Sequence, residues 1–111
     1  MHGDLVYFVI AAPDSQRART FYGGLFGWDI TPGNVEDGWQ IRRSTPPGGM
    51  QGGANAGPPQ VYFEVDDLEQ AMLRVTALGG EADGPKGSGA GSYANCRDDQ
   101  GSEFSIFQAA G

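Results

Sequence analysis

The sequence predicts an α+β fold built from two copies of a β-α-β-β-β module. Residues 6–27 and residues 60–80 carry this prediction, because each reads as a strand, a tight turn and a helix that ends in glycine. Superposing Asp14 on Asp67 aligns these two stretches throughout. A repeat at about half the chain length indicates one module used twice.

The length of the chain limits how this repeat is organised. A chain of 111 residues is expected to form one domain, since each half alone would bury too little apolar surface to be stable. We therefore predict a single domain over residues 1–111, with the first module at about residues 5–54 and the second at about residues 60–108.

The first module begins with the β-branched and aromatic run of residues 5–12, which is typical of a buried strand. Asp14 or Ser15 is expected to cap the helix that follows, and Gly27 to end it. The apolar face of this helix contains Ala18, Phe21, Tyr22 and Leu25. Three shorter strands are predicted at residues 28–30, at residues 39–43 and, weakly, near Met50 and Gln51.

The second module repeats this order with a strand at residues 60–65 and a helix capped by Asp66 and Asp67. The apolar face of the helix contains Leu68, Ala71, Met72, Val75 and Leu78. Further strands are predicted at residues 81–82, 92–97 and 103–108. The glycine-rich stretch at residues 84–91 is expected to be a mobile lid or a plain connection, since it lacks the ending of a phosphate-binding loop.

Side chains alternate between the two faces of a strand, so the apolar sets are expected to lie under the helices. Phe8, Phe63 and Ile106 belong to that covered face. The opposite face carries mixed polar and aromatic residues, and the two helices are both used on the other side. It is therefore expected to be a cleft or a contact with another chain.

The composition excludes several classes of function. A net charge of −7 argues against nucleic acid and against an anionic membrane surface as partners. Cys96 is the only cysteine, which fits a reducing compartment, and no apolar run is long enough to span a membrane. We expect a cytoplasmic protein. The only histidine, His2, is expected to be disordered.

Three motifs in order resemble the vicinal oxygen chelate superfamily, which contains glyoxalase I, extradiol dioxygenases and bleomycin-resistance proteins. They are the stretch from Phe21 to Trp28 with its Phe-Gly-Trp ending, the stretch from residue 62 to residue 80, and the stretch from residue 98 to residue 104. The resemblance implies curved mixed sheets that form a cleft, with the helices outside. It also implies a homodimer.

The resemblance places metal ligands on the cleft face, with a His or Gln on the first strand and a Glu on the last strand of each module. Those positions fall here on Tyr7, Gln60 and Ser105, and near Met50 or Gln51. A phenol, an amide and a hydroxyl are poor ligands for a divalent catalytic metal. We therefore predict no metal and no other cofactor.

The cleft face supplies the candidate ligand-binding residues, which are Tyr7, Trp39, Gln60, Tyr62, Glu64, Tyr93, Glu103, Ser105 and Phe107. The aromatic members could form a wall for a flat ligand, or serve in ordinary packing or a dimer contact. Glu64 and Glu103 could attract a cation, or be solvated, or pair with Arg42, Arg43 or Arg97. Cys96 is expected to be a packed thiol rather than a nucleophile.

The leading functional prediction is a metal-free protein that binds an aromatic or cationic small molecule in a dimer cleft. One alternative is a metal-dependent lyase, isomerase or dioxygenase with unconventional ligands such as Glu64 or Glu103. This would require a strand register that differs by one residue, which exchanges the two faces. A second alternative is a protein-interaction module. The sequence does not name the ligand.

Overall fold

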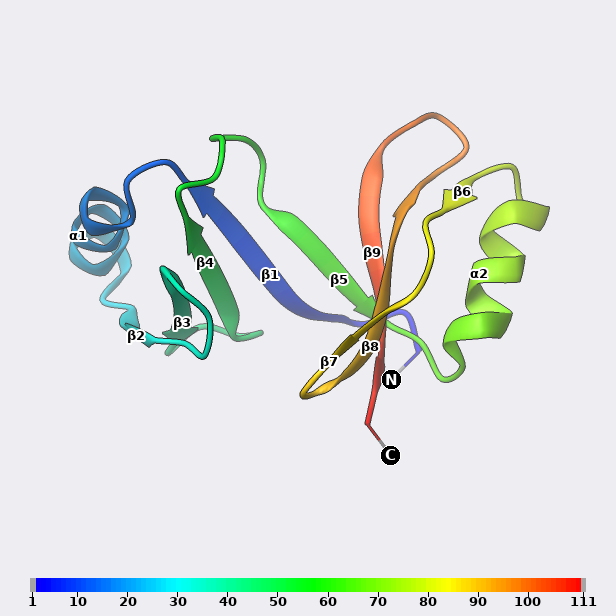
Figure 1. Ribbon diagram of the computed structural model, residues 1–111, viewed down its shortest axis with the longest axis horizontal. Coiled ribbons are helices and arrows are strands. Elements are labelled where there is room, and N and C mark those ends of the chain that lie inside the picture. Colours follow the sequence, from blue (N-terminus) through cyan, green and yellow to red (C-terminus); the bar gives the residue numbers. More distant parts are fainter. Residues whose placement is uncertain (1, 111) are drawn as a thin grey trace. The chain divides into compact units, whose positions relative to one another are not determined.

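The computed structural model describes residues 2–110, and the chain divides into two compact units (Figure 1). The first unit is Tyr7–Gln60. The second unit combines the residues up to Val6 with those from Val61 onward. Each unit contains one helix packed on its own strands, in agreement with the predicted pair of modules (Figure 1).

The first module has the predicted order of one strand, one helix and three strands. The elements are β1 (Leu5–Ala12), α1 (Ser15–Phe26), β2 (Asp29–Pro32), β3 (Gly38–Arg42) and β4 (Gly48–Gly52). The strands lie in the order β2-β3-β4-β1. β1 and β4 are parallel, and the other neighbours are antiparallel. The weakly predicted strand near Met50 is thus β4, and it starts earlier than expected because Gly48 and Gly49 belong to it.

The second module repeats the plan with one addition. Its elements are β5 (Gln60–Glu64), α2 (Leu68–Ala77), β6 (Glu81–Ala82), β7 (Lys86–Ser88), β8 (Gly91–Arg97) and β9 (Glu103–Ala109). The strands lie in the order β5-β9-β8-β6, with β5 parallel to β9. β7 was not predicted, because the glycine-rich sequence of residues 84–91 shows no strand pattern. It pairs antiparallel with β8, so part of that stretch is sheet rather than loop.

The two helices begin in the same way. The Asp14 side chain accepts a hydrogen bond from the Arg17 amide at 3.1 Å, and the Asp67 side chain accepts one from the Gln70 amide at 3.0 Å. These bonds satisfy amides that have no partner inside the helix. α1 ends at Gly27, whose left-handed φ of 69° allows its N–H to bond the carbonyl of Gly23.

Each unit has its own small core beneath its helix. Ile10, Ala12, Ile41 and Met50 form the first core. Val65, Leu68, Ala94, Cys96 and Ile106 form the second. Phe8 packs against the first core and Phe104 against the second, so the predicted covered faces are correct.

The helix faces are narrower than the sequence predicted. Phe21 is 62% exposed, Leu25 60% and Leu78 66%, although all three were assigned to buried faces. Ala18 and Tyr22 of α1 do contact the core. A residue at helical spacing can still lie at the edge of the buried stripe, and a short helix on a small sheet covers only the middle of that stripe.

The start of the chain packs on the second unit. The Gly3 amide donates to the Glu64 carbonyl at 2.6 Å, and the Glu64 amide donates to the Asp4 carbonyl at 2.8 Å. His2 was expected to be disordered, but its Nδ1 accepts a hydrogen bond from the Asp66 amide at 3.2 Å. Within residues 2–110, neither helix is long and apolar enough to cross a membrane.

Candidate functional site

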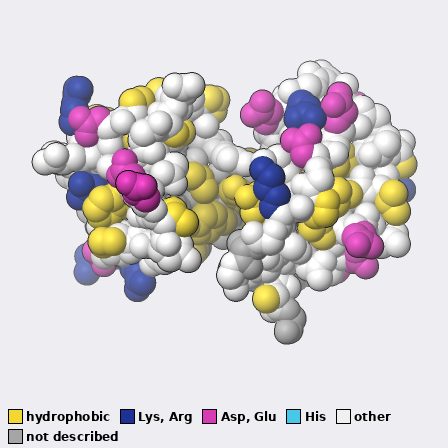
Figure 2. Space-filling model, viewed as in Figure 1, with side chains coloured by type: hydrophobic (Ala, Val, Ile, Leu, Met, Phe, Trp, Pro, Cys, Tyr) yellow, Lys and Arg dark blue, Asp and Glu magenta, His cyan; other side chains and the backbone are white. Residues whose placement is uncertain are grey.

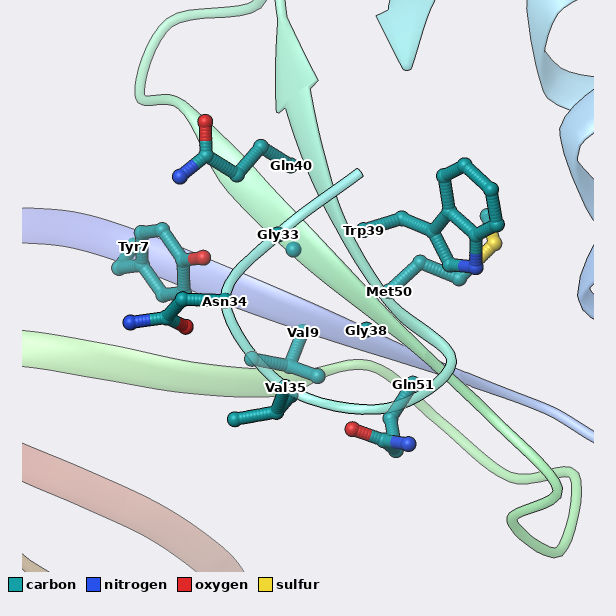
Figure 3. Close-up of a pocket in the computed structure, with 11 residues that line it drawn as sticks. Tyr7, Val9, Gly33, Asn34, Val35, Gly38, Trp39, Gln40, Met50 and Gln51 are labelled. Atoms are coloured by element: carbon teal, nitrogen blue, oxygen red, sulfur yellow. The ribbon is translucent and has the colours of Figure 1, made fainter. Parts of the chain in front are cut away.

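The face of the first unit opposite α1 contains a hollow of about 170 Å³ (Figure 3). β1 contributes Tyr7 and Val9 to its lining. The turn after β2 and the start of β3 contribute residues 33–35 and 38–40, and β4 contributes residues 49–51. The sequence predicted an uncovered polar and aromatic face, and this hollow lies on that face.

Tyr7 lies across β4 at Gly49. A Cβ atom built on Gly49 would approach the Tyr7 hydroxyl oxygen to 2.6 Å, which is closer than real Cβ contacts. The absence of a side chain at Gly49 therefore makes the room for the phenol. Burial raises the pKa of Tyr7 above its ordinary value, so the side chain is a neutral hydrogen-bond donor at physiological pH.

The turn that walls the hollow is held by Asp37, a residue with a left-handed φ of 53°. Its carboxylate oxygen Oδ1 accepts hydrogen bonds from the Ser15 hydroxyl at 2.6 Å and from the Trp39 indole at 3.0 Å. These two bonds lower the pKa of Asp37. The Asp37 carbonyl also accepts the Gly52 amide at 2.8 Å. The turn is thus tied to α1, β3 and β4 together.

Trp39 lines part of the hollow, but its ring lies on the face of the sheet that α1 covers. It packs against the first core, and the Arg19 guanidinium lies 3.8 Å from the ring centroid. Figure 3 shows the indole turned away from Tyr7. Among the predicted aromatic wall residues in this unit, Tyr7 is therefore the one whose ring faces the hollow.

The corresponding face of the second unit gathers several other predicted residues. The rings of Tyr62 and Tyr93 meet edge to face, with centroids 5.7 Å apart. Tyr62 pairs with Ser105 across β5 and β9, and Tyr93 pairs with Phe107 across β8 and β9. Ser105 is completely buried, and its hydroxyl donates to Asn95 Oδ1 at 2.8 Å. These residues share one face, as the alternation predicted.

Arg97, one of the cations considered as partners for the predicted acidic residues, bonds two other carboxylates. Glu103 is exposed and Glu64 is half-buried. Arg97 was a candidate partner for both, but its guanidinium instead bonds Glu81 at 3.2 Å and Asp83 at 3.0 Å. Figure 2 shows acidic side chains spread over both units rather than gathered in one patch on the visible face.

Gln60 and Cys96, which the sequence analysis also considered, differ in their exposure to solvent. Gln60 is exposed at the start of β5. Cys96 lies in the second core at 1% exposure, and burial raises the pKa of its thiol. Because the thiolate is the nucleophile, this environment suits a packed thiol rather than a reactive one.

The strand register identifies the position in the first module that corresponds to Ser105. Val9 corresponds to Tyr62 in the sequence repeat, Val9 pairs with Gly49, and Tyr62 pairs with Ser105. The counterpart of Ser105 is therefore Gly49. The sequence placed it near Met50 or Gln51, which is wrong by one or two residues because a glycine run has no side-chain alternation to read.

A family model described as a glyoxalase-like domain matches residues 7–107, which is nearly the whole chain. The chain belongs to this family. The vicinal oxygen chelate superfamily that the motifs indicated is thereby confirmed, while the Phe-Gly-Trp subgroup stays a prediction. No protein in the curated set matches the sequence significantly.

Solved structures share the fold of this glyoxalase-like chain at low identity. Methylmalonyl-CoA epimerase from Mycobacterium tuberculosis is 16% identical with a TM-score of 0.74, covering 98% of this chain and 89% of its own. Homoprotocatechuate 2,3-dioxygenase from Brevibacterium fuscum is 18% identical with a TM-score of 0.74, covering 98% and 38%. The Mn(II)-bound glyoxalase from Novosphingobium aromaticivorans is 17% identical with a TM-score of 0.69, covering 95% and 37%. The chain thus spans well under half of the latter two proteins.

The residues at the superfamily's metal positions do not suit a divalent metal. Gly49 has no side chain, and the neutral Tyr7 phenol fills the space in front of it. Ser105 is buried, and its hydroxyl is directed to Asn95. Among residues 2–110, no group of three or more His, Cys, Asp or Glu side chains could hold a metal ion. The donor chemistry of this glyoxalase-like chain therefore disagrees with the metal that the superfamily implies.

Sequence reasoning missed four residues of these faces, namely Asn34, Gln40, Gly49 and Asn95. Asn95 could have been found, because it lies two residues from Tyr93 on its strand and alternation fixes the face. Gln40 could not, because the sequence assigned its neighbour Trp39 to this face and alternation then places Gln40 on the other one. Asn34 belongs to a turn, and Gly49 to a glycine run. Neither of these segments carries a periodic signal.

Proposed function

We propose that the chain is a metal-free small-molecule-binding protein of the glyoxalase-like family, which works as a homodimer in the cytoplasm and takes an aromatic or cationic ligand. The observation that carries this proposal is the pair of Tyr7 and Gly49, where a neutral phenol occupies the position of a metal ligand beside an open hollow. The ligand-binding residues in this proposal are eight of the nine predicted from the sequence, together with Asn34 and Gln40; Ser105 is left out because it has no exposed surface.

The second unit supports the same reading. Ser105 has no exposed surface and donates to Asn95, and the Tyr62 and Tyr93 rings lie on the same face. A neutral hydrogen-bonded pair beside aromatic rings is a surface that suits binding by stacking and by hydrogen bonds.

The decisive experiment combines metal analysis with ligand binding. Protein purified without added metal is analysed by elemental mass spectrometry before and after incubation with Zn, Mn, Fe and Ni, and is then dialysed against cationic aromatic dyes and neutral aromatics. We expect less than stoichiometric metal under every condition and saturable retention of at least one compound. Stoichiometric metal that survives a chelator wash, or no retention of any compound, would contradict the proposal.

A metal-dependent enzyme is the second candidate, because the solved neighbours include a Mn(II)-bound glyoxalase and a dioxygenase. It would need Glu64 or Glu103 as a ligand. Phe63 and Phe104 contact one another, with ring centroids 6.4 Å apart, and Phe104 packs against the second core. This register counts against the one-residue slip on which that candidate was based.

A protein-interaction module is the third candidate. The exposed Phe21 and Leu25 of α1 provide apolar surface that a partner could cover. Light scattering of the purified chain distinguishes a homodimer from a monomer. A dimer that retains no small molecule would favour this candidate over ligand binding.

A further inference from the structure

None of the eleven described residues that line the hollow of the first unit carries a charge. This is notable in a chain of which 19% is Asp, Glu, Lys or Arg. The turn between Val35 and Gly38 contains Glu36 and Asp37, but neither belongs to the lining. The Asp37 carboxylate is bound to Ser15 and Trp39 instead. A cation that entered the hollow would find no lining carboxylate to offset the loss of its hydration.

Two polar side chains of the lining can donate to a ligand. Gln40 Oε1 accepts a hydrogen bond from Arg42 Nη2 at 3.1 Å, and Figure 3 shows the Gln40 nitrogen on the side of Tyr7. A hydrogen bond from a cation to the amide oxygen strengthens the amide N–H as a donor. The Asn34 amide lies on the same side of the hollow as the Gln40 amide.

The remaining lining amide is already engaged. Gln51 Nε2 donates to the carbonyl oxygens of Glu36 at 3.2 Å and Gly52 at 3.1 Å, so this donor is already used within the protein. Val9 and Val35 provide the apolar part of the lining. The hollow therefore combines an apolar floor with donors along one side.

Partial desolvation also disfavours a negative charge beside Tyr7, which is 36% exposed and whose pKa is raised. No lining residue is a cation that would offset this cost. The volume of about 170 Å³ is similar to the roughly 150 Å³ of an engineered cavity that holds benzene. The hollow thus has room for one six-membered ring with a small substituent.

We propose that the hollow takes an uncharged, single-ring molecule that presents a hydrogen-bond acceptor, such as an aromatic carboxamide or a lactam. Gln40 and Asn34 donate to the acceptor, and Val9 contacts the ring. This assignment rests on the proposed ligand-binding function and narrows it, because it removes cations from the ligands of this hollow.

Three probes of nearly identical shape test the assignment, namely benzamide, benzamidinium and benzoate, which are neutral, cationic and anionic. The side-chain amide signals of Asn34 and Gln40 are followed by ¹H–¹⁵N NMR during titration of the full chain. We expect benzamide to bind about tenfold more tightly than either ion. An ion loses more hydration free energy than benzamide on entering the hollow, and a modest difference in that loss gives a tenfold ratio of dissociation constants.

A matched pair of variants locates the effect. Asn34→Asp places a carboxylate in the lining, and Asn55→Asp makes the same change at an exposed residue outside it. We expect Asn34→Asp to shift the ratio of the two dissociation constants toward benzamidinium by roughly tenfold, while Asn55→Asp leaves the ratio unchanged.

The outcomes separate this assignment from the proposed function. Tighter binding of benzamidinium or benzoate at these two amides would overturn the assignment and leave ligand binding in place. Shifts that occur only elsewhere in the chain would overturn it in the same way. If none of the three probes shifts any signal, the assignment fails, and the dialysis experiment then decides whether the chain binds ligands at all.

Discussion

The two modules share one fold but have different side chains at the same position of the last strand. In the first module, the position opposite β1 on the last strand is Gly49, and the Tyr7 ring lies over it. In the second module, the equivalent position is Ser105, which is buried and bonded to Asn95. At these equivalent positions one module thus has an aromatic ring over a glycine, and the other has a neutral hydrogen bond. The comparison teaches that the same position of the fold can be filled by packing or by a polar pair.

The modules also differ in what their polar side chains bond to and in whether solvent reaches them. The Asp37 network of the first unit ties a turn to α1 and walls an open hollow. The Asn95–Ser105 pair of the second unit lies within the sheet, with Ser105 out of reach of solvent. The polar network of the first unit thus borders an open hollow, whereas the Ser105 hydroxyl of the second unit is closed to a ligand.

The largest expected effect comes from the two cores. Ile41→Ala and Ile106→Ala each remove a side chain that is 4% exposed or less, and each should lower the free energy of unfolding by about 2–5 kcal/mol. Urea denaturation followed by circular dichroism measures the loss. If the units fold as one domain, both variants will shift the same single transition. Two separate transitions would show that the units unfold independently.

Ser105→Ala is expected to have the next largest effect. It removes the hydrogen bond to Asn95 Oδ1 in a fully buried position and should cost about 1–3 kcal/mol. Ser44→Ala removes a side-chain hydrogen bond at a half-buried residue and serves as the control. Equal losses in the two variants would contradict the view that the Asn95–Ser105 pair is an important stabilising contact of the second unit.

The helix caps test whether Asp14 and Asp67, which the sequence repeat aligns, contribute equally to the stability of the two modules. Asp14→Ala and Asp67→Ala each remove one cap hydrogen bond, and both should cost about 1 kcal/mol of unfolding free energy. Thermal denaturation of the two variants compares them directly. A loss of stability in one variant alone would show that one of the helices does not depend on its aspartate.

The smallest expected effect is the pH dependence contributed by Tyr7. Its pKa is raised above 10.0 in the folded chain, so the unfolded chain loses this proton first as pH rises. Stability from this group is therefore constant below pH 10 and falls as pH rises through the pKa of the folded state. Tyr7→Phe should flatten that alkaline decline. Chemical denaturation of the parent chain and of Tyr7→Phe between pH 8 and about 11 measures the difference.

Much of this fold could be read from local pattern. The repeat, the capping residues Asp14 and Asp67, and the alternation around Phe63 and Phe104 each follow from the spacing of a few residues, and the structure bears them out. Such features are decided by neighbours along the chain. The superfamily was recognised from three motifs in a fixed order along the sequence, which requires no knowledge of contacts between elements.

The candidate site was only half accessible to the same reasoning. Tyr7 and Ser105 were assigned by counting along strands, whereas the position of Gly49 was placed one or two residues further on and Asn34 was overlooked. Trp39 was assigned to a ligand wall because strand alternation near a turn did not reveal that Arg19 covers its ring. These errors lie where the chain has glycines or turns, which provide no periodic signal.

The sequence by itself determined the module plan, the helix starts and the faces of the long strands, because each depends on the periodicity of side chains along one element. Only the tertiary structure decided which residues meet across elements. The Tyr7 hydroxyl over Gly49, the Asp37 carboxylate between Ser15 and Trp39, and the Ser105 hydroxyl on Asn95 each join residues far apart in sequence. Such contacts depend on strand register and on close packing, which no single element specifies.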